Sequence, residues 1–275
     1  MCSTAKNANI ILLTGQSNAV GVGFVKHLYD HFPKEQVQTY IDGYPKIRIN
    51  YNSHDKESGG FVTTTVHCTE VNKYTIGPEV GIAQALQEAD PDAEWFIIKC
   101  AFGGTSMYHD WLSPTGRTFA GAAIDERTGW CWAAFEKILA ESMEILRAQG
   151  YAPSIRAFCW MQGESDADTM EHVRAYRANY DAMLCDLRAL YGDLMEDCVY
   201  VDAGISEIWN LWQEINAIKV AYAAEADNRV YLDTVAAGLT TKNEPVEEPD
   251  IAHYDSDCVI RLGQMFAGAF LGKNA

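Results

Sequence analysis

The chain lacks the long apolar segment that a membrane span or a secretory signal peptide requires. Its amino terminus has no positively charged stretch followed by a longer apolar region and a cleavage site, and the apolar run at residues 10–13 is too short for that role. We therefore expect no membrane association and a cytoplasmic location. A chain trimmed of its signal peptide would have the same features, and in that case the protein would be secreted.

The sequence also lacks the cysteine and histidine patterns that bind metals. None of its eight cysteines forms a C-x-x-C pair, and Cys100 and Cys159 lie in apolar runs where a free thiol acts as a small apolar side chain. His27 and His31 are four residues apart, but neither a third ligand nor an H-E-x-x-H pattern accompanies them, which indicates a solvated helix face. We expect reduced thiols, no metal and no other cofactor.

Positive charge is scarce. The chain has 21 Lys and Arg against 38 Asp and Glu, a formal net charge of −17. No basic face is available to neutralise phosphates, so nucleic acid is not an expected partner. The acidic composition favours solubility and says nothing about the substrate or the oligomeric state.

What the sequence does contain is an alternation of apolar strands and amphipathic helices. This order predicts a parallel sheet covered by helices on both faces, formed by residues 1–275 as a single domain. The predicted strands are 9–13, 95–101, 154–161, 198–204 and 229–233. The predicted helices are 24–32, 77–89, 130–149, a long one ending near 191, 207–226 and a last one ending near 271.

Three segments lack this alternation. Residues 37–75 are rich in Val, Tyr, Ile and Thr and are interrupted by glycines, which predicts strands and long loops near the site. Residues 108–129 form an aromatic, Gly-rich loop that includes Tyr108 and Trp111. Residues 242–249 are acidic and contain prolines, as is typical of a solvated surface loop.

The first predicted strand ends in a group of small and polar residues, Gly15-Gln16-Ser17-Asn18. Ligands of parallel sheets bind beyond the carboxyl ends of the strands, so Ser17 lies where catalysis usually takes place. Gly15 permits a sharp turn, and the amides of Ser17 and Asn18 could face an anion. Ser17 could equally cap the following helix, so this motif needs support from others.

Two further strand ends carry glycine beside polar side chains. The strand at 95–101 is followed by Gly103-Gly104, whose backbone N–H groups could approach a ligand or simply form a turn. The strand at 154–161 is followed by the segment 162–167, which contains Gln162 and Glu164. Backbone amides of Ser17 and Gly104 (or Gly103), together with the Gln162 side chain, could therefore form an oxyanion hole.

A serine hydroxyl attacks an ester only when a base takes its proton. His253 is the best candidate for that base, and Asp250 three residues earlier could hold its tautomer and stabilise the imidazolium. A D-x-x-H sequence close to a helix start also occurs as a simple cap. Ser17, His253 and Asp250 are thus the predicted catalytic set.

These blocks, in this order, resemble the SGNH (GDSL-like) hydrolases. Within that family they are most similar to the branch of sialate O-acetylesterase-like and acetylxylan esterase enzymes (carbohydrate esterase family 6). The resemblance covers residues 9–270 and is carried by Gly15-Gln16-Ser17-Asn18, Gly103-Gly104-Thr105-Ser106, Trp160-Met161-Gln162-Gly163-Glu164-Ser165-Asp166-Ala167 and Asp250-Ile251-Ala252-His253-Tyr254.

The resemblance implies a three-layer α/β/α, flavodoxin-like domain that removes acetyl groups from sugars without a metal. It implies Ser17 as nucleophile, His253 as base, Asp250 as its orienter, and Gly104 and Gln162 as partners of the Ser17 amide in the oxyanion hole. The neighbouring Gln16, Asn18, Gly103 and Glu164 would support the site or bind substrate. Glu164 could pair with His253, contact substrate or hold its loop.

Two alternatives fit the sequence less well. An α/β-hydrolase elbow, G-x-S-x-G, needs glycine where this chain has Ala19. A non-catalytic module that binds phosphate or another anion would leave Asp250 and His253 without a role, and no G-x-x-x-x-G-K-[ST] pattern is present. The resemblance implies an acetylated carbohydrate as partner, with xylo-oligosaccharide and sialic acid both open. The aromatic loop residues Tyr108 and Trp111 could stack on any sugar.

Overall fold

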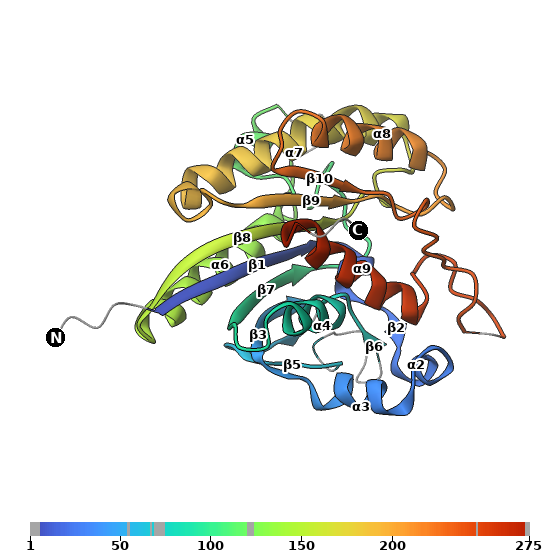
Figure 1. The fold of residues 1–275 in the computed structure, drawn as a ribbon. Coiled ribbons are helices and arrows are strands. Elements are labelled where there is room, and N and C mark those ends of the chain that lie inside the picture. Colours follow the sequence, from blue (N-terminus) through green and yellow to red (C-terminus); the bar gives the residue numbers. More distant parts are fainter. Residues whose placement is uncertain are drawn as a thin grey trace.

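The computed structural model describes residues 6–53, 56–66, 68, 75–119, 124–245 and 247–272. Within these residues an eight-stranded sheet runs in the order β10-β9-β8-β1-β7-β3-β4, with β5 also paired to β3 (Figure 1). Its strands are β1 (Lys6–Gly15), β3 (Tyr44–Ser53), β4 (Lys56–Glu57), β5 (Val62–Thr64), β7 (Trp95–Ala101), β8 (Tyr151–Met161), β9 (Val199–Ala203) and β10 (Arg229–Leu232). The short strands β2 (Gly23–Phe24) and β6 (Thr75–Ile76) form a separate antiparallel pair.

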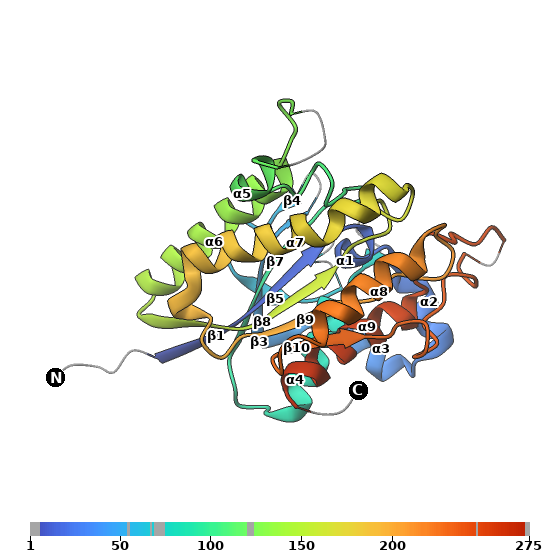
Figure 2. The same cartoon turned by 90° about the horizontal axis from the view of Figure 1, so that it is seen from above.

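Helices cover both faces of the sheet, as the alternation in the sequence predicts. The α-helices are α1 (Ser17–Val20), α2 (Val25–His31), α3 (Lys34–Asp42), α4 (Glu79–Ala89), α5 (Pro114–Arg117), α6 (Trp130–Ala148), α7 (Met170–Tyr191), α8 (Trp212–Ala223) and α9 (Ser256–Phe270). A 3₁₀ turn, η1 (Gly192–Leu194), follows α7. Helices α6 and α7 lie on one side of the sheet, and α4 and α9 lie together on the other (Figures 1 and 2). The α/β/α architecture is therefore confirmed.

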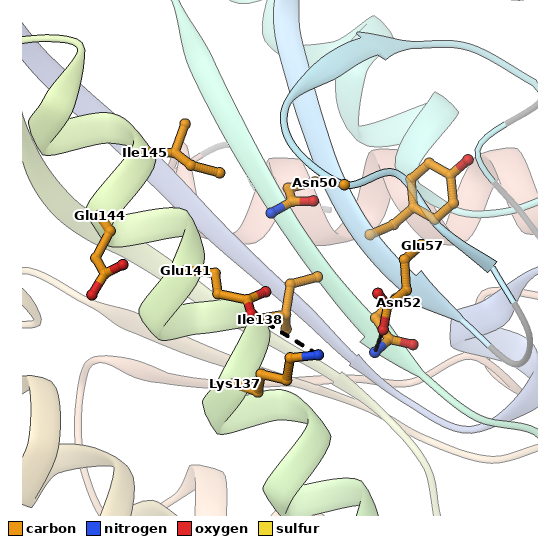
Figure 3. A pocket seen from close by; sticks show the side chains of 10 residues that line it. Asn50, Asn52, Glu57, Lys137, Ile138, Glu141, Glu144 and Ile145 are labelled. Carbon is orange, nitrogen blue, oxygen red and sulfur yellow. Dashed lines mark hydrogen bonds and ion pairs between the residues drawn. The ribbon is translucent and has the colours of Figure 1, made fainter.

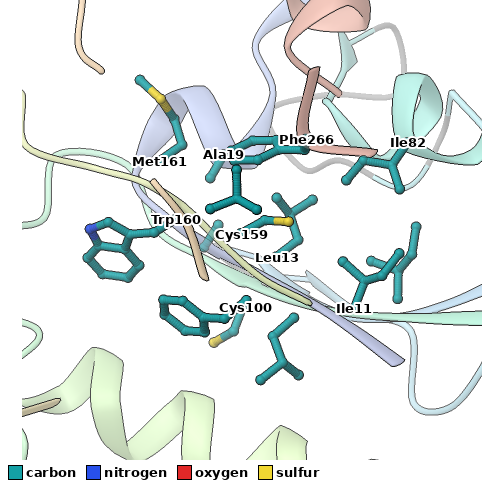
Figure 4. Packing of buried hydrophobic residues seen from close by; sticks show 14 of the residues in the cluster. Ile11, Leu13, Ala19, Ile82, Cys100, Cys159, Trp160, Met161 and Phe266 are labelled. Carbon is teal, nitrogen blue, oxygen red and sulfur yellow. The ribbon is translucent and has the colours of Figure 1, made fainter. Parts of the chain in front are cut away.

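Alternating side chains of the central strands fill the two layers of core between sheet and helices. On one face Leu13 and Cys159 lie toward Phe266 of α9, and on the other Cys100 and Trp160 lie toward the α6 and α7 side (Figure 4). Strand β1 is buried on both faces from Ile10 to Leu13, because it lies in the middle of the sheet. None of the helices in the described ranges is long and apolar enough to cross a membrane.

The structure corrects three predicted segments. Residues 34–42 form helix α3, where strands and loops were expected from residue 37, because Val37 and Tyr40 are buried on one helical face despite their preference for strands. The predicted helix 207–226 begins only at Trp212. The aromatic loop contains the short helix α5, and its residues 120–123 lie outside the described residues, as do residues 54–55, 67 and 69–74 of the strand-and-loop region.

The parallel pairing of the central strands aligns their carboxyl ends. Gly15 pairs with Ala101 of β7 on one side and with Met161 of β8 on the other. Its φ angle is +139°, and a Cβ atom at this position would collide with the Met161 carbonyl oxygen. Only glycine therefore lets the three strands approach one another this closely. The segments that follow these strands consequently begin side by side.

A buried ion pair fixes the end of the first turn after β1. Lys99 of β7 donates to Oε2 of Glu79 at 2.7 Å and to the carbonyl oxygen of Val20, the last residue of α1, at 2.6 Å. Both charged side chains are fully buried. Burial raises the pKa of Glu79, while the neighbouring ammonium group lowers it.

We expect Lys99→Met to destabilise the fold by about 3–5 kcal/mol, because it leaves a carboxyl group buried without its partner. The double variant Lys99→Met with Glu79→Gln should recover much of that loss, since no unpaired charge remains. Urea unfolding measures both values. A Lys99→Met protein as stable as the wild type would show that the pair contributes nothing to this region.

Candidate active site

The turn that carries Ser17 is held directly on the sheet. The backbone N–H of Gln16 donates to the Met161 carbonyl oxygen at 2.9 Å, and Ser17 then begins helix α1. The first N–H groups of a helix have no acceptor within the helix, so the Ser17 amide is available to an oxyanion. Ser17 is half-buried and lines a cleft.

Asp250 and His253 form a compact pair in the loop between β10 and α9. His253 Nδ1 lies 2.6 Å from Oδ2 of Asp250, and the His253 backbone N–H donates to the Asp250 carbonyl oxygen at 3.2 Å. A carboxylate on Nδ1 favours the tautomer in which Nδ1 carries the proton, so Nε2 is left free to accept one. This is the arrangement that a general base requires.

One cleft joins these residues. It has a volume of about 530 Å³ and is lined by Gln16, Ser17, Val22, Gly103, Gly104, Ser165, Trp209, Asp250, Ala252 and His253. Gly104 is exposed in the cleft wall with φ of +68°, a conformation that glycine adopts readily. Segments following β1, β7, β8, β9 and β10 therefore meet at one edge of the sheet, and the predicted catalytic residues meet there with them.

Asn18 connects the turn that carries Ser17 (the serine turn) with the loop between β10 and α9 that carries His253 (the histidine loop). Its Nδ2 donates to Oε1 of Glu164 at 2.8 Å and to the carbonyl oxygen of Ala252 at 3.4 Å, and its Oδ1 accepts from the Tyr254 backbone N–H at 3.0 Å. The last two contacts flank His253 on either side. Asn18 is itself buried, so it lies behind the cleft and not in its wall.

Glu164 supports Asn18 and does not hydrogen-bond to His253 in the described structure. The side chain is buried, and its second oxygen, Oε2, has no hydrogen-bond partner among the described residues. Burial raises the pKa of Glu164, and the Asn18 amide and the charges of Lys219 and His253 oppose this rise. Of the two carboxylates predicted to serve His253, Asp250 makes the contact.

Gln162 is buried behind the cleft and is absent from its lining. Its NH₂ group donates to Oδ2 of Asp166, to the Thr105 carbonyl oxygen at 3.1 Å and to Oε1 of Gln16 at 3.3 Å. The structure thus does not bring this amide to the cleft surface. Its role in an oxyanion hole stays a prediction, since the amide would have to turn away from Asp166 to reach the cleft.

Asp166 holds the loops around the cleft in place, a role that its position in the sequence does not indicate. It accepts hydrogen bonds from the backbone N–H groups of Met107 and Tyr108 at 2.8 and 3.0 Å, in addition to Gln162. Burial raises the pKa of Asp166 to about 6, against the effect of these donors. Asp166 thereby ties the loop that follows Gly104 to the segment after β8.

Among the described residues that line the cleft, the large aromatic side chain is Trp209, and neither Tyr108 nor Trp111 is among them. Trp111 is fully buried and donates its indole N–H to Oγ1 of Thr105 at 3.0 Å, so the prediction that it stacks on a sugar is wrong. Tyr108 is stacked on His172 with ring centroids 4.2 Å apart. The sequence predicts a helix at Trp209, but α8 begins only at Trp212, and Trp209 lies in the cleft wall.

The structure gives His31 neighbours that the sequence did not indicate. Its Nε2 lies 3.0 Å from Glu244 and 3.9 Å from Asp257, whereas His27 lies 3.4 Å from Asp30. Within the described ranges, His31, Glu244 and Asp257 form a group compact enough to hold a metal ion. However, Glu244 already accepts from the backbone N–H and hydroxyl of Ser256, so the group is explained as a structural anchor of the histidine loop.

A separate hollow of about 270 Å³ lies between α6 and the β3–β4 hairpin, and none of the predicted site residues lines it (Figure 3). Two asparagines on its wall already have hydrogen-bond partners. Asn50 binds Ser58 and Ser142, and Asn52 binds Glu57. These two amides therefore have little hydrogen-bonding capacity left for a ligand.

A mostly parallel α/β sheet with a serine turn and an aspartate–histidine pair in one cleft has the groups that a serine hydrolase requires. Comparison of the chain with known protein families identifies its family. The chain belongs to the family described as carbohydrate esterase, sialic acid-specific acetylesterase, whose sequence profile matches residues 7–272. It is accordingly a carboxylic ester hydrolase.

Solved structures share the fold at low sequence identity. A protein from Arabidopsis thaliana is 20% identical with a TM-score of 0.66, and the alignment covers 97% of this chain and 99% of that one. NanS is 18% identical with a TM-score of 0.67, covering 98% of each chain. A carbohydrate acetylesterase from Xanthomonas citri is 14% identical with a TM-score of 0.56, covering 96% of this chain and 55% of that one. A comparison with curated protein sequences found no match.

We expect Asn18→Ala to lower kcat on the order of 100-fold, because it frees the backbone on both sides of His253 and a shift of about 1 Å costs that much. The matched control is Asn50→Ala, which removes another buried asparagine whose Nδ2 donates to Ser142 at 2.8 Å away from the cleft. Both variants should lose stability, and only Asn18→Ala should lose kcat. Equal effects on kcat would show that Asn18 has a purely structural role.

Proposed function

We propose that this chain removes O-acetyl groups from carbohydrates through a covalent acetyl-enzyme on Ser17. The observation that carries the proposal is the 2.6 Å contact between His253 Nδ1 and Asp250 in the cleft that Ser17 also lines. Membership of a carbohydrate esterase family supports the same chemistry and argues against a non-catalytic anion-binding module.

In the first half-reaction the Ser17 oxygen attacks the acetyl carbonyl carbon while Nε2 of His253 takes the hydroxyl proton. The negative charge on the carbonyl oxygen is stabilised by the backbone N–H groups of Ser17 and Gly104. Gln162 is the third candidate donor. Collapse of the intermediate expels the sugar oxygen, which receives the proton from His253.

In the second half-reaction water replaces the sugar. Nε2 of His253 takes a proton from the water, which attacks the acetyl-Ser17 carbonyl and releases acetate. Asp250 holds the imidazole in one orientation throughout and stabilises its charged form. These residues supply nucleophile, base and oxyanion donors, so the proposed reaction requires no metal.

The direct test is acetate release by the purified protein from a panel of acetylated sugars, including acetylated xylo-oligosaccharides and O-acetylated sialic acid. We expect release that Ser17→Ala abolishes and that survives EDTA. The rate should fall at acid pH, because a protonated His253 cannot accept the serine proton. Loss of activity with EDTA and recovery with zinc would contradict the proposed mechanism.

A matched pair of variants distinguishes the roles of the two carboxylates, Asp250 and Glu164. We expect Asp250→Asn to lower kcat on the order of 10⁴-fold with the fold retained, because the amide favours the wrong imidazole tautomer. Glu164→Gln should act more mildly, since the amide oxygen can still accept from Asn18. The reverse order of effects on kcat would assign the orienting role to Glu164.

A further inference from the structure

A second hollow opens at the same edge of the sheet as the cleft, between the loops that follow β9 and β10. Its volume is about 220 Å³, and its wall includes Ser206, Glu207, Val235, Thr240, Thr241 and Lys242. Strands β9 and β10 are parallel neighbours, so the loops at their carboxyl ends lie next to each other. The reaction described above gives this hollow no role.

Two features connect this hollow with the cleft. The segment 206–208 lines the hollow, and Trp209, the next residue, lines the cleft. Asp255, two residues after His253, donates its backbone N–H to the Thr240 carbonyl oxygen at 2.9 Å. The segment 206–209 thus borders both the hollow and the cleft.

The wall of the hollow offers hydrogen-bonding groups and no unbalanced charge. The Ser206 hydroxyl is buried and has no partner among the described residues, although buried hydroxyls normally have one. Lys242 donates to Glu207 at 2.8 Å, and both side chains are exposed at the rim. A ligand hydroxyl can join this pair as donor and acceptor, whereas a ligand carboxylate would compete with Glu207 for Lys242.

We propose that this hollow is a second sugar subsite, which binds a neutral ring attached to the acetylated one. The proposal rests on the proposed esterase function and adds a substrate class to it: neutral acetylated oligosaccharides in preference to acetylated monosaccharides and acidic sugars. Among the described residues, the cleft lining includes no lysine or arginine, which accords with a neutral substrate. Contacts to the remote ring raise kcat/KM because they hold the ester against Ser17.

The test compares an acetylated xylobiose with the corresponding acetylated methyl xyloside. We expect kcat/KM to be on the order of tenfold or more higher for the disaccharide. Val235→Trp, which places a large ring in the hollow, should lower the value for the disaccharide to that for the monosaccharide and leave the latter unchanged. The matched control is Val220→Trp, at an exposed position on α8 outside the hollow, which should change neither value.

A binding measurement separates this proposal from the proposed function. Unacetylated xylobiose should bind to the wild-type protein in a calorimetric or NMR titration, and Val235→Trp should abolish that binding whether or not the protein hydrolyses esters. Sialic acid should not compete. Equal kcat/KM values for the two substrates, or xylobiose binding unaffected by Val235→Trp, would overturn the subsite. Failure to release acetate from any sugar, with xylobiose binding intact, would overturn the esterase function and leave the subsite standing.

Discussion

The site depends above all on the parallel pairing of β1 with β7 and β8. The pairing places Gly15 level with Ala101 and Met161, so three polar segments start from one line at the edge of the sheet. The close approach is possible because residue 15 has no side chain. Each predicted block of the site then needs only a short turn to reach the cleft, and the turns inherit the rigidity of a sheet that is buried on both faces.

Buried polar contacts convert this alignment into a defined site. Asn18 holds the backbone on both sides of His253, and Asp166 holds the loop after Gly104 against the segment after β8. A hydrogen bond made inside a protein is stronger than one in water, and an unmade one is costly, so such contacts fix geometry sharply. The residues that line the cleft are thereby held from behind by buried side chains that are not part of its lining.

Much of this arrangement could be predicted from the sequence because its signals are local. Apolar runs ending in glycine marked β1, β7 and β8, and the D-x-x-H spacing marked a pair that does form a hydrogen bond. Helix α3 was missed because Val and Tyr favour strands locally, while burial of one face of 34–42 decides its conformation. Trp209 was missed because the start of α8 depends on tertiary contacts, such as the Leu211 N–H on the Ala167 carbonyl oxygen.

Contacts between distant parts of the chain gave no sequence signal. Asn18 and Tyr254 are far apart in sequence, and nothing in either segment indicates that they share a hydrogen bond. The orientation of Gln162 is equally unreadable, because it is decided by the buried carboxyl of Asp166 beside it and not by its position in a motif. The other two acceptors of this amide, Oε1 of Gln16 and the Thr105 carbonyl oxygen, lie in segments that follow β1 and β7.

The central claim is that Ser17 is the nucleophile of an ester hydrolase and that His253 activates it. The most direct measurement is peptide mapping by mass spectrometry after reaction with a fluorophosphonate, which modifies activated serines. The account predicts a single modified residue, Ser17, and loss of that modification in His253→Ala with the fold intact. An active esterase that carries the modification at another residue, or none at all, would contradict it.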